Sequence, residues 1–312
     1  MQIENYTYHY HAFGLSVASQ IEIPEFVSSE NSIDEQVIIK INNVPEKLDH
    51  AQFSGVRFEG LPGKFLLKVD NVARYLVSNG TTIEIQAYEN SKEKDIRLFL
   101  LGSAIGALLH QRGLLPMHGS AVQIKEKAFL FSGISGVGKS TLAASFAKQG
   151  FPVLTDDVCV VSTNDNGKPL IYPGYPQMKL WADSIARLGA EAEKLNAVRD
   201  GIQKYGVSFN NSYTGEPLEL AGIYIISTKN TDGFTLKEIK GIEKFNILKN
   251  NTYRLNFIKG TGTTPTHFKH LNNIAQHCFA KTLERPSKGF HLAELTDLIT
   301  TDINSYYGNL DR

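Results

Sequence analysis

One stretch of nine residues decides the fold: Gly133-Ile134-Ser135-Gly136-Val137-Gly138-Lys139-Ser140-Thr141. The spacing of its first and last glycines, followed by lysine and serine, is that of a phosphate-binding loop. Apolar residues 128–131 before it predict a buried strand, and residues 142–147 after it predict a helix that ends near Gly150. The sequence therefore predicts an α/β core that binds nucleotide.

The residue types of this loop suit the phosphates of ATP. Backbone N–H groups of such a loop curl around phosphate oxygens at the start of a helix, where the helix dipole favours negative charge. Lys139 is expected to reach the terminal phosphates, and the Ser140 hydroxyl to ligate Mg²⁺. We expect the loop contacts to come from Gly133, Ser135, Gly136, Val137, Gly138, Lys139, Ser140 and Thr141.

Composition narrows the function classes. The 312 residues include 32 basic and 32 acidic side chains, which argues against nucleic acid or an anionic membrane as a partner. The two cysteines, Cys159 and Cys278, lie far apart without zinc-type spacing, so a reducing, cytoplasmic location is expected. The N-terminus does not read as a signal peptide, and the most apolar segment, residues 98–109, is too short to span a bilayer.

The pattern predicts two domains. Residues 1–94 read as a β-rich N-terminal domain, with a meander of strands at 64–69, 73–77 and 81–85. Residues 95–312 read as the nucleotide-binding domain, which begins with a buried helix. Later helices are expected at 182–201, 266–283 and 292–307, and a strand at 220–227.

Two further features supply candidate catalytic groups. Asp156 and Asp157 end the strand after the loop helix, 17 residues beyond Lys139. Of two adjacent carboxylates beside a triphosphate, one can contact magnesium while the other accepts the proton of an attacking hydroxyl. His118 is expected to start the strand before the loop strand, next to small residues that leave its face open to a ligand.

Together these motifs resemble the catalytic domain of HPr kinase/phosphorylase. A His-Gly pair lies 15 residues before Gly133, and the paired aspartates begin 23 residues after it, as in that family. The resemblance implies a phosphate-loop kinase core of the type shared with phosphoenolpyruvate carboxykinase. It implies catalytic roles for Asp156 as the base, His118 and Lys139, and metal roles for Ser140, Asp157 and, in the segment Glu219-Leu220-Ala221-Gly222-Ile223, Glu219. Either Arg254 or Arg285 would complete the site.

The overall layout is similar to HPr-kinase-like proteins of peptide-maturation clusters, some of which, the lasso-peptide kinases, phosphorylate a serine of a precursor peptide. The resemblance implies an ATP- and Mg²⁺-dependent serine kinase acting on a peptide or small protein. The segment 173–176, with Lys179 and Trp181, either borders the acceptor or nucleotide site or forms a rigid turn beside a packed indole. Two other functions remain open: a nucleotide-binding regulatory module without transfer, and an enzyme like phosphoenolpyruvate carboxykinase. The oligomeric state also remains open, with a homo-oligomer among the options.

Overall fold

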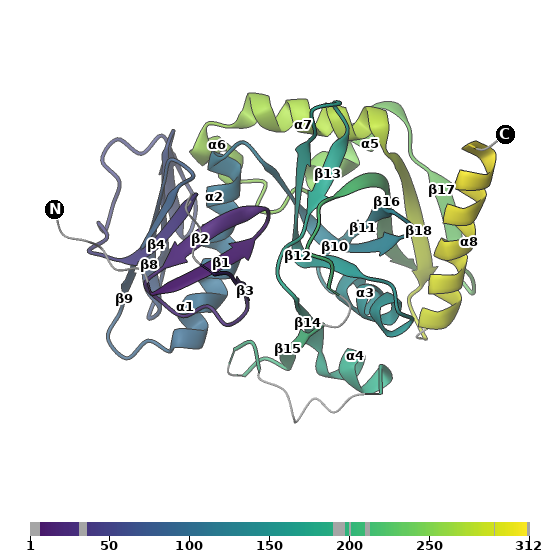
Figure 1. Ribbon diagram of the computed structural model, residues 1–312, viewed down its shortest axis with the longest axis horizontal. Coiled ribbons are helices and arrows are strands. Elements are labelled where there is room, and N and C mark those ends of the chain that lie inside the picture. Colours follow the sequence, from purple (N-terminus) through teal and green to yellow (C-terminus); the bar gives the residue numbers. More distant parts are fainter. Residues whose placement is uncertain are drawn as a thin grey trace.

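Two β-sheets lie side by side in the structure, with a long helical segment between them (Figure 1). The computed structural model describes residues 7–30, 36–189, 197–199, 201–209, 213–289 and 291–310. Helices cover both sheets, so the α/β class and the strand-rich N-terminal part are confirmed.

The N-terminal sheet has nine strands in the order β3-β1-β2-β4-β9-β8-β7-β6-β5. Its last strands form the predicted antiparallel meander, in which Asn71 and Asn79 adopt positive φ at the turns. Only β2–β4 and β4–β9 pair in parallel within this sheet as described. The strands are β1 (Tyr8–Ala12), β2 (Leu15–Ser19), β3 (Val27–Ser28), β4 (Val37–Ile41), β5 (Phe53–Ser54), β6 (Phe58–Leu61), β7 (Lys64–Val69), β8 (Ala73–Ser78) and β9 (Thr82–Ala87).

The helical segment that follows packs on this sheet and faces the second one. It consists of α1 (Glu93–Phe99), a π-helical turn (Leu100–Ala104) and α2 (Ile105–Gln111). Its buried side chains belong to the core of the N-terminal sheet, and that core continues onto Val158 and Val160 of the second sheet. The predicted domain boundary at residues 94 and 95 therefore falls inside α1, and the helix shares its core with the first sheet.

The second sheet holds the phosphate loop. Its order is β11-β10-β12-β13-β16-β18-β17, and β11 also pairs in parallel with β16, so the sheet curls back on itself. The strands are β10 (Leu115–Ile124), β11 (Lys127–Gly133), β12 (Val153–Thr163), β13 (Pro169–Tyr172), β16 (Leu218–Lys229), β17 (Thr235–Glu238) and β18 (Phe279–Pro286). A separate ribbon joins β14 (Gln177–Trp181) to β15 (Lys204–Ser208).

Helices cover the two faces of the second sheet. On one face lie α3 (Lys139–Lys148) and α8 (Leu292–Leu310), and on the other α5 (Gly241–Asn250) and α7 (Thr264–His277). Short helices α4 (Ala182–Arg187) and α6 (Phe257–Thr261) follow the ribbon strand β14 and precede α7, respectively. Figure 1 shows α4, β14 and β15 together at the end of the molecule nearest α3.

Three expectations from the sequence need correction. The helix predicted over 266–283 ends at His277, and residues 279–283 belong to strand β18, which pairs in parallel with β16. The helix predicted over 182–201 ends at Arg187, and residues 190–196 and 200 lie outside the described residues. His118 lies inside β10, which begins three residues earlier at Leu115. Within the described ranges, no helix is both long enough and apolar enough to cross a membrane.

Candidate active site

The predicted phosphate loop lies between β11 and α3, as the sequence indicates. Gly133, Gly136 and Gly138 adopt φ values of 139°, 82° and 107°, a left-handed region that costs glycine little because it has no Cβ. At Gly133 an added Cβ would also collide with the backbone carbonyl of Ile226, whereas nothing lies within 4 Å of such an atom at Gly136. The loop is therefore shaped by tight packing at its base and is open at its tip.

The ammonium group of Lys139 lies inside this loop. Its Nζ donates hydrogen bonds to the carbonyl oxygens of Gly133 and Ile134, both at 2.9 Å. Burial lowers the pKa of Lys139, and the nearby carboxylates of Asp157 and Asp156 oppose that shift. A buried cation held only by neutral carbonyls is well placed to exchange them for phosphate oxygens.

Asp156 is buried beneath the phosphate-binding surface, with both of its oxygens engaged. Oδ1 accepts a hydrogen bond from Ser120 Oγ at 2.6 Å, and Oδ2 accepts one from the backbone N–H of Lys179 at 3.1 Å. The Ser140 side chain lies close enough to Asp156 to oppose the rise of its pKa. Burial, and then the charge of Asp157, raise the pKa of Asp156. Its side chain is thus placed behind Ser140, where it can orient that hydroxyl.

Asp157 faces the cavity instead. In a regular strand neighbouring side chains point to opposite faces, but φ at Asp157 is +71°, and its carboxylate lies among Lys179, His118 and the phosphate loop. Oδ2 is 3.4 Å from Lys179 Nζ, and Oδ1 is 3.5 Å from His118 Nδ1. Burial alone would raise the pKa of Asp157, but the positive charge of Lys179, with a smaller effect from Lys204, outweighs it and lowers that pKa.

The imidazole of His118 is held in one orientation by the same acid. Nδ1 lies 3.2 Å from the backbone carbonyl oxygen of Asp157, an acceptor, so this nitrogen carries the proton and donates. Burial, and then the charge of Lys139, lower the pKa of His118, which is therefore neutral at neutral pH. Nε2 is left as the hydrogen-bond acceptor of the ring.

The surface above the loop is hollowed into a cavity of about 260 Å³ with an excess of positive charge. Five cationic side chains line it against two carboxylates, those of Asp157 and Asp183. The cations come from α3, β14, α4, β15 and the end of β18: Lys139, Lys179, Arg187, Lys204 and Arg285. Such a lining, together with the N–H groups at the start of α3, suits a ligand with several negative charges.

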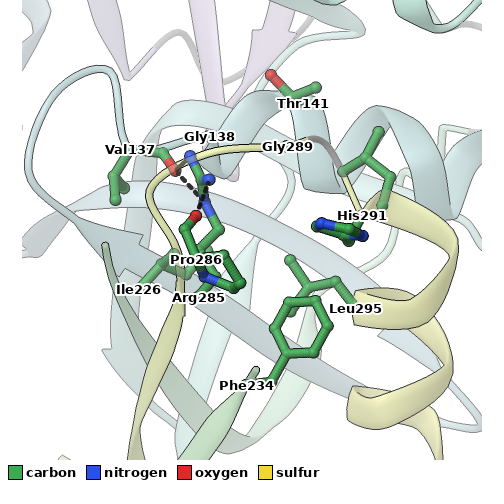
Figure 2. Close-up of a pocket in the computed structure, with 11 residues that line it drawn as sticks. Val137, Gly138, Thr141, Ile226, Phe234, Arg285, Pro286, Gly289, His291 and Leu295 are labelled. Atoms are coloured by element: carbon green, nitrogen blue, oxygen red, sulfur yellow. Dashed lines mark hydrogen bonds between the residues drawn. The ribbon is translucent and has the colours of Figure 1, made fainter. Parts of the chain in front are cut away.

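Of the two candidate arginines, Arg285 is the one at the loop. Figure 2 shows its guanidinium directed at the backbone of Val137, whose carbonyl oxygen accepts from Nε at 3.2 Å and from Nη2 at 3.0 Å. The same residue borders a smaller hollow of about 20 Å³ beside Gly138, which Phe234 and His291 close with an edge-on ring contact. Arg254 stacks instead on the rings of Tyr253 and Phe257.

Glu219 does not join the other predicted metal ligands. Strand β16 runs parallel to β11, and its register pairs Leu220 with Ala128 but Ile226 with Gly133. Because the phosphate loop follows the end of β11, the start of β16 lies at the opposite edge of the sheet. There Glu219 forms ion pairs with Lys127 at 2.7 Å and Lys168 at 3.4 Å. The predicted magnesium role of Glu219 is therefore not supported by its position.

The remaining residues fit a magnesium ion that arrives with phosphates. Across the described ranges, no group of three or more His, Cys, Asp or Glu side chains is close enough to hold a metal. Mg²⁺ bound to nucleotide needs only one or two protein ligands, because phosphate oxygens and waters supply the others. Ser140, backed by Asp156 and facing the cavity that Asp157 lines, meets that requirement. The Thr141 hydroxyl is not available as a magnesium ligand, because it donates a hydrogen bond to Ser184 Oγ at 3.1 Å.

The structure brings in residues that the sequence did not single out. Ser120, Lys204 and Arg187 all contact the site or line it. Ser120 sits directly opposite Asp156 in the antiparallel pair β10–β12, so its role follows from register. Lys204 reaches the cavity because β15 pairs with β14 across a long insertion, which leaves no local signal in the sequence. Lys179 and Trp181, flagged from the sequence, both line the cavity.

Comparison with known proteins gives a distant structural similarity and no match to a protein family. No protein family model matches the chain, and no curated protein is similar to it at a significant level. Among solved structures it is similar to the Hpr(Ser) kinase/phosphatase from Coxiella burnetii, with a TM-score of 0.34 and 12% sequence identity. That match covers 63% of this chain and 99% of the other. At this level of similarity the activity of that enzyme does not transfer to this chain.

Proposed function

We propose that this protein binds ATP with Mg²⁺ on the loop 133–141 and transfers the terminal phosphate to a serine hydroxyl of a peptide or small protein. One observation carries the proposal: a phosphate loop, five cations and an accessible carboxylate line one cavity. Phosphoryl transfer depends chiefly on positioning and charge neutralisation, which such a lining supplies.

Each group has a role that follows from its position. Lys139, Arg285 and the N–H groups of the loop hold the phosphates, and Ser140 holds Mg²⁺ with Asp156 orienting its hydroxyl. Bound Mg²⁺ neutralises phosphate charge. Lys179 secures Asp157 at the cavity surface.

The proton acceptor in this proposal is Asp157, in place of the Asp156 implied by the family resemblance. Asp156 is 3% exposed and both its oxygens already accept hydrogen bonds, whereas the Asp157 side chain is 24% exposed and lines the cavity. In the transfer, the serine oxygen bonds to the γ-phosphorus while the bond to the β,γ-bridging oxygen breaks. The electrons of that bond stay on ADP, and the serine proton passes to Asp157.

Calorimetric titration of ATP with Mg²⁺ tests the nucleotide site. Lys139→Ala removes a charge-assisted contact worth about 1.5–3 kcal/mol, so the Kd should rise about 10- to 100-fold. The matched control is Lys127→Ala, the same change at the opposite edge of the sheet beside Glu219. It should leave the Kd unchanged, as should Glu219→Gln.

Two results would contradict the proposal. Equal ATP affinity in wild-type protein and Lys139→Ala would mean that the loop does not bind phosphate. Tight, loop-dependent binding with no transfer to any serine-containing peptide would instead identify a nucleotide-binding regulatory module, and oxaloacetate-dependent nucleotide turnover would identify a carboxykinase-like enzyme.

A further inference from the structure

A second and larger cavity lies between the N-terminal part of the chain and the β14–β15 ribbon. Its volume is about 460 Å³, within the range of ligand-binding pockets. One wall comes from the loop after β2 and from α1, the other from the ribbon. Its charged and polar lining includes Glu25, Lys94, Arg97, Gln177 and Lys179.

The ribbon connects this cavity to the phosphate-loop cavity. Residues 177, 179 and 181 of β14 share one face because side chains alternate along a strand. In the register of the ribbon, Gly206 lies opposite Lys179 and Lys204 lies opposite Trp181. Gln177 and Gly206 line the larger cavity, Trp181 and Lys204 line the phosphate-loop cavity, and Lys179 lines both.

Lys179 therefore stands where the two cavities meet, with its Nζ 3.4 Å from the carboxylate of Asp157. An occupant of the larger cavity that extends along the ribbon passes this lysine and arrives at the proposed proton acceptor. Gln177 and Trp181 are four residues apart, which is about 13 Å at the rise of a strand. An extended peptide of about four residues spans that length.

The charges of the larger cavity indicate what kind of peptide it takes. Three cations, Lys94, Arg97 and Lys179, line it against the single carboxylate of Glu25 among its described lining residues; Arg97 pairs with that carboxylate, and Lys179 pairs with Asp157 of the neighbouring cavity. Glu25 Oε1 is occupied by Arg97 Nε at 3.2 Å, while Oε2 is buried and has no hydrogen-bond partner within the described ranges. An unpaired buried acceptor costs about 1–3 kcal/mol.

Resting on the kinase function proposed above, we infer that this cavity receives the acceptor peptide, and that it selects acceptors with acidic residues near the phosphorylated serine. The peptide runs along the face of the ribbon that carries Gln177, Lys179 and Trp181, with its acidic side chain toward Lys94 and its serine hydroxyl beside Asp157. The N-terminal sheet and α1 then contribute to substrate selection while taking no part in nucleotide binding.

Three pools of synthetic ten-residue peptides test this inference. Each peptide has one central serine, and the flanking positions are acidic in one pool, neutral in the second and basic in the third. Transfer is measured with radiolabelled ATP, and binding by fluorescence anisotropy with a non-hydrolysable ATP analogue present. Wild-type protein should favour the acidic pool about tenfold over the neutral pool, the effect of about 1.4 kcal/mol.

The variant Lys94→Glu reverses one charge of the cavity wall and should abolish that preference. Lys237→Glu is the matched control, since it makes the same change on the exposed strand β17 of the second sheet, and should keep the preference. Both variants should retain the wild-type affinity for ATP with Mg²⁺. Transfer to the peptides without a preference for the acidic pool overturns the inference alone, whereas ATP binding with no transfer to any pool contradicts the proposed kinase function as well. Loss of ATP binding in the wild-type protein would refute the proposed function itself.

Discussion

Replacement of Asp157 by asparagine tests the proposed chemistry most directly. The change removes the proton acceptor, which typically contributes about 10²- to 10⁴-fold to a rate, equivalent to about 3–5 kcal/mol of transition-state stabilisation. It also removes the ion pair with Lys179, whose side chain is only 10% exposed. The asparagine oxygen can still accept from Lys179 Nζ, so we expect the protein to remain folded and to bind ATP with nearly wild-type affinity.

The partner variant is Asp156→Asn, which the site can accommodate. The asparagine oxygen can accept from the backbone N–H of Lys179, and its amide can donate to Ser120, whose hydroxyl rotates to accept. The main loss is then the negative charge behind Ser140. We expect a higher Mg²⁺ requirement for transfer and a smaller fall in kcat than for Asp157→Asn at saturating Mg²⁺.

Single-turnover transfer to the preferred peptide pool, measured across Mg²⁺ concentrations, separates these effects. Urea denaturation of both variants checks that each is folded. If Asp157→Asn keeps most of its transfer rate while Asp156→Asn loses about 10³-fold even at saturating Mg²⁺, the roles of the two carboxylates are the reverse of those proposed.

Three other expectations concern stability and charge. Burial lowers the pKa of both His110 and His267 to about 4 from an ordinary value of 6.5. Between pH 4 and 6.5 the unfolded chain therefore binds more protons than the native protein. The unfolding free energy should fall by up to about 3 kcal/mol per histidine as the pH drops from 6.5 to 4. Urea titrations that give equal unfolding free energies at pH 7 and pH 5 would contradict this. Gly119→Ala places a Cβ 2.5 Å from the carbonyl oxygen of Phe131 and should lower stability by about 1–3 kcal/mol, which an unchanged thermal midpoint would disprove. Arg285→Met should weaken ATP binding about tenfold at low salt and less at high salt. Calorimetry that shows no loss of affinity at low salt would mean that the guanidinium does not contact the phosphates.

The sequence was most informative where structure depends on neighbouring residues. The glycines of the loop, the asparagine turns of the meander and the turn glycine Gly150 after α3, with φ of +88°, have conformational requirements that local residue types reveal. The adjacency of Asp156 and Asp157 also pointed to the correct place, although both lie inside β12, which continues to Thr163, and do not end it. The sequence did not show that Asp157 adopts a positive φ, which turns its carboxylate toward the cavity.

Long-range pairing limited the other predictions. Glu219 was expected near magnesium. It lies at the start of β16, however, and because β16 pairs in parallel with β11, that start lies at the opposite edge of the sheet from the phosphate loop, which follows the end of β11. Residues 279–283 follow α7 without a glycine or proline between them, and so short a segment of mixed polarity does not by itself distinguish a helix from a strand. Lys204 reaches the site through the ribbon, whose two strands are separated by more than twenty residues of chain.

In the proposed function, the position of Lys179 links nucleotide binding to acceptor recognition. Its backbone N–H fixes Asp156, its ammonium group fixes Asp157, and its side chain borders both cavities. A single residue of the ribbon thus contacts the group that orients the proposed magnesium ligand and the group that accepts the proton. The ribbon also forms one wall of the larger cavity beside α1. An acceptor bound in that cavity therefore affects the two carboxylates through the contacts that Lys179 makes with them. In the proposed function, specificity and catalysis therefore depend on the same strand, whereas nucleotide affinity depends on the loop and Arg285.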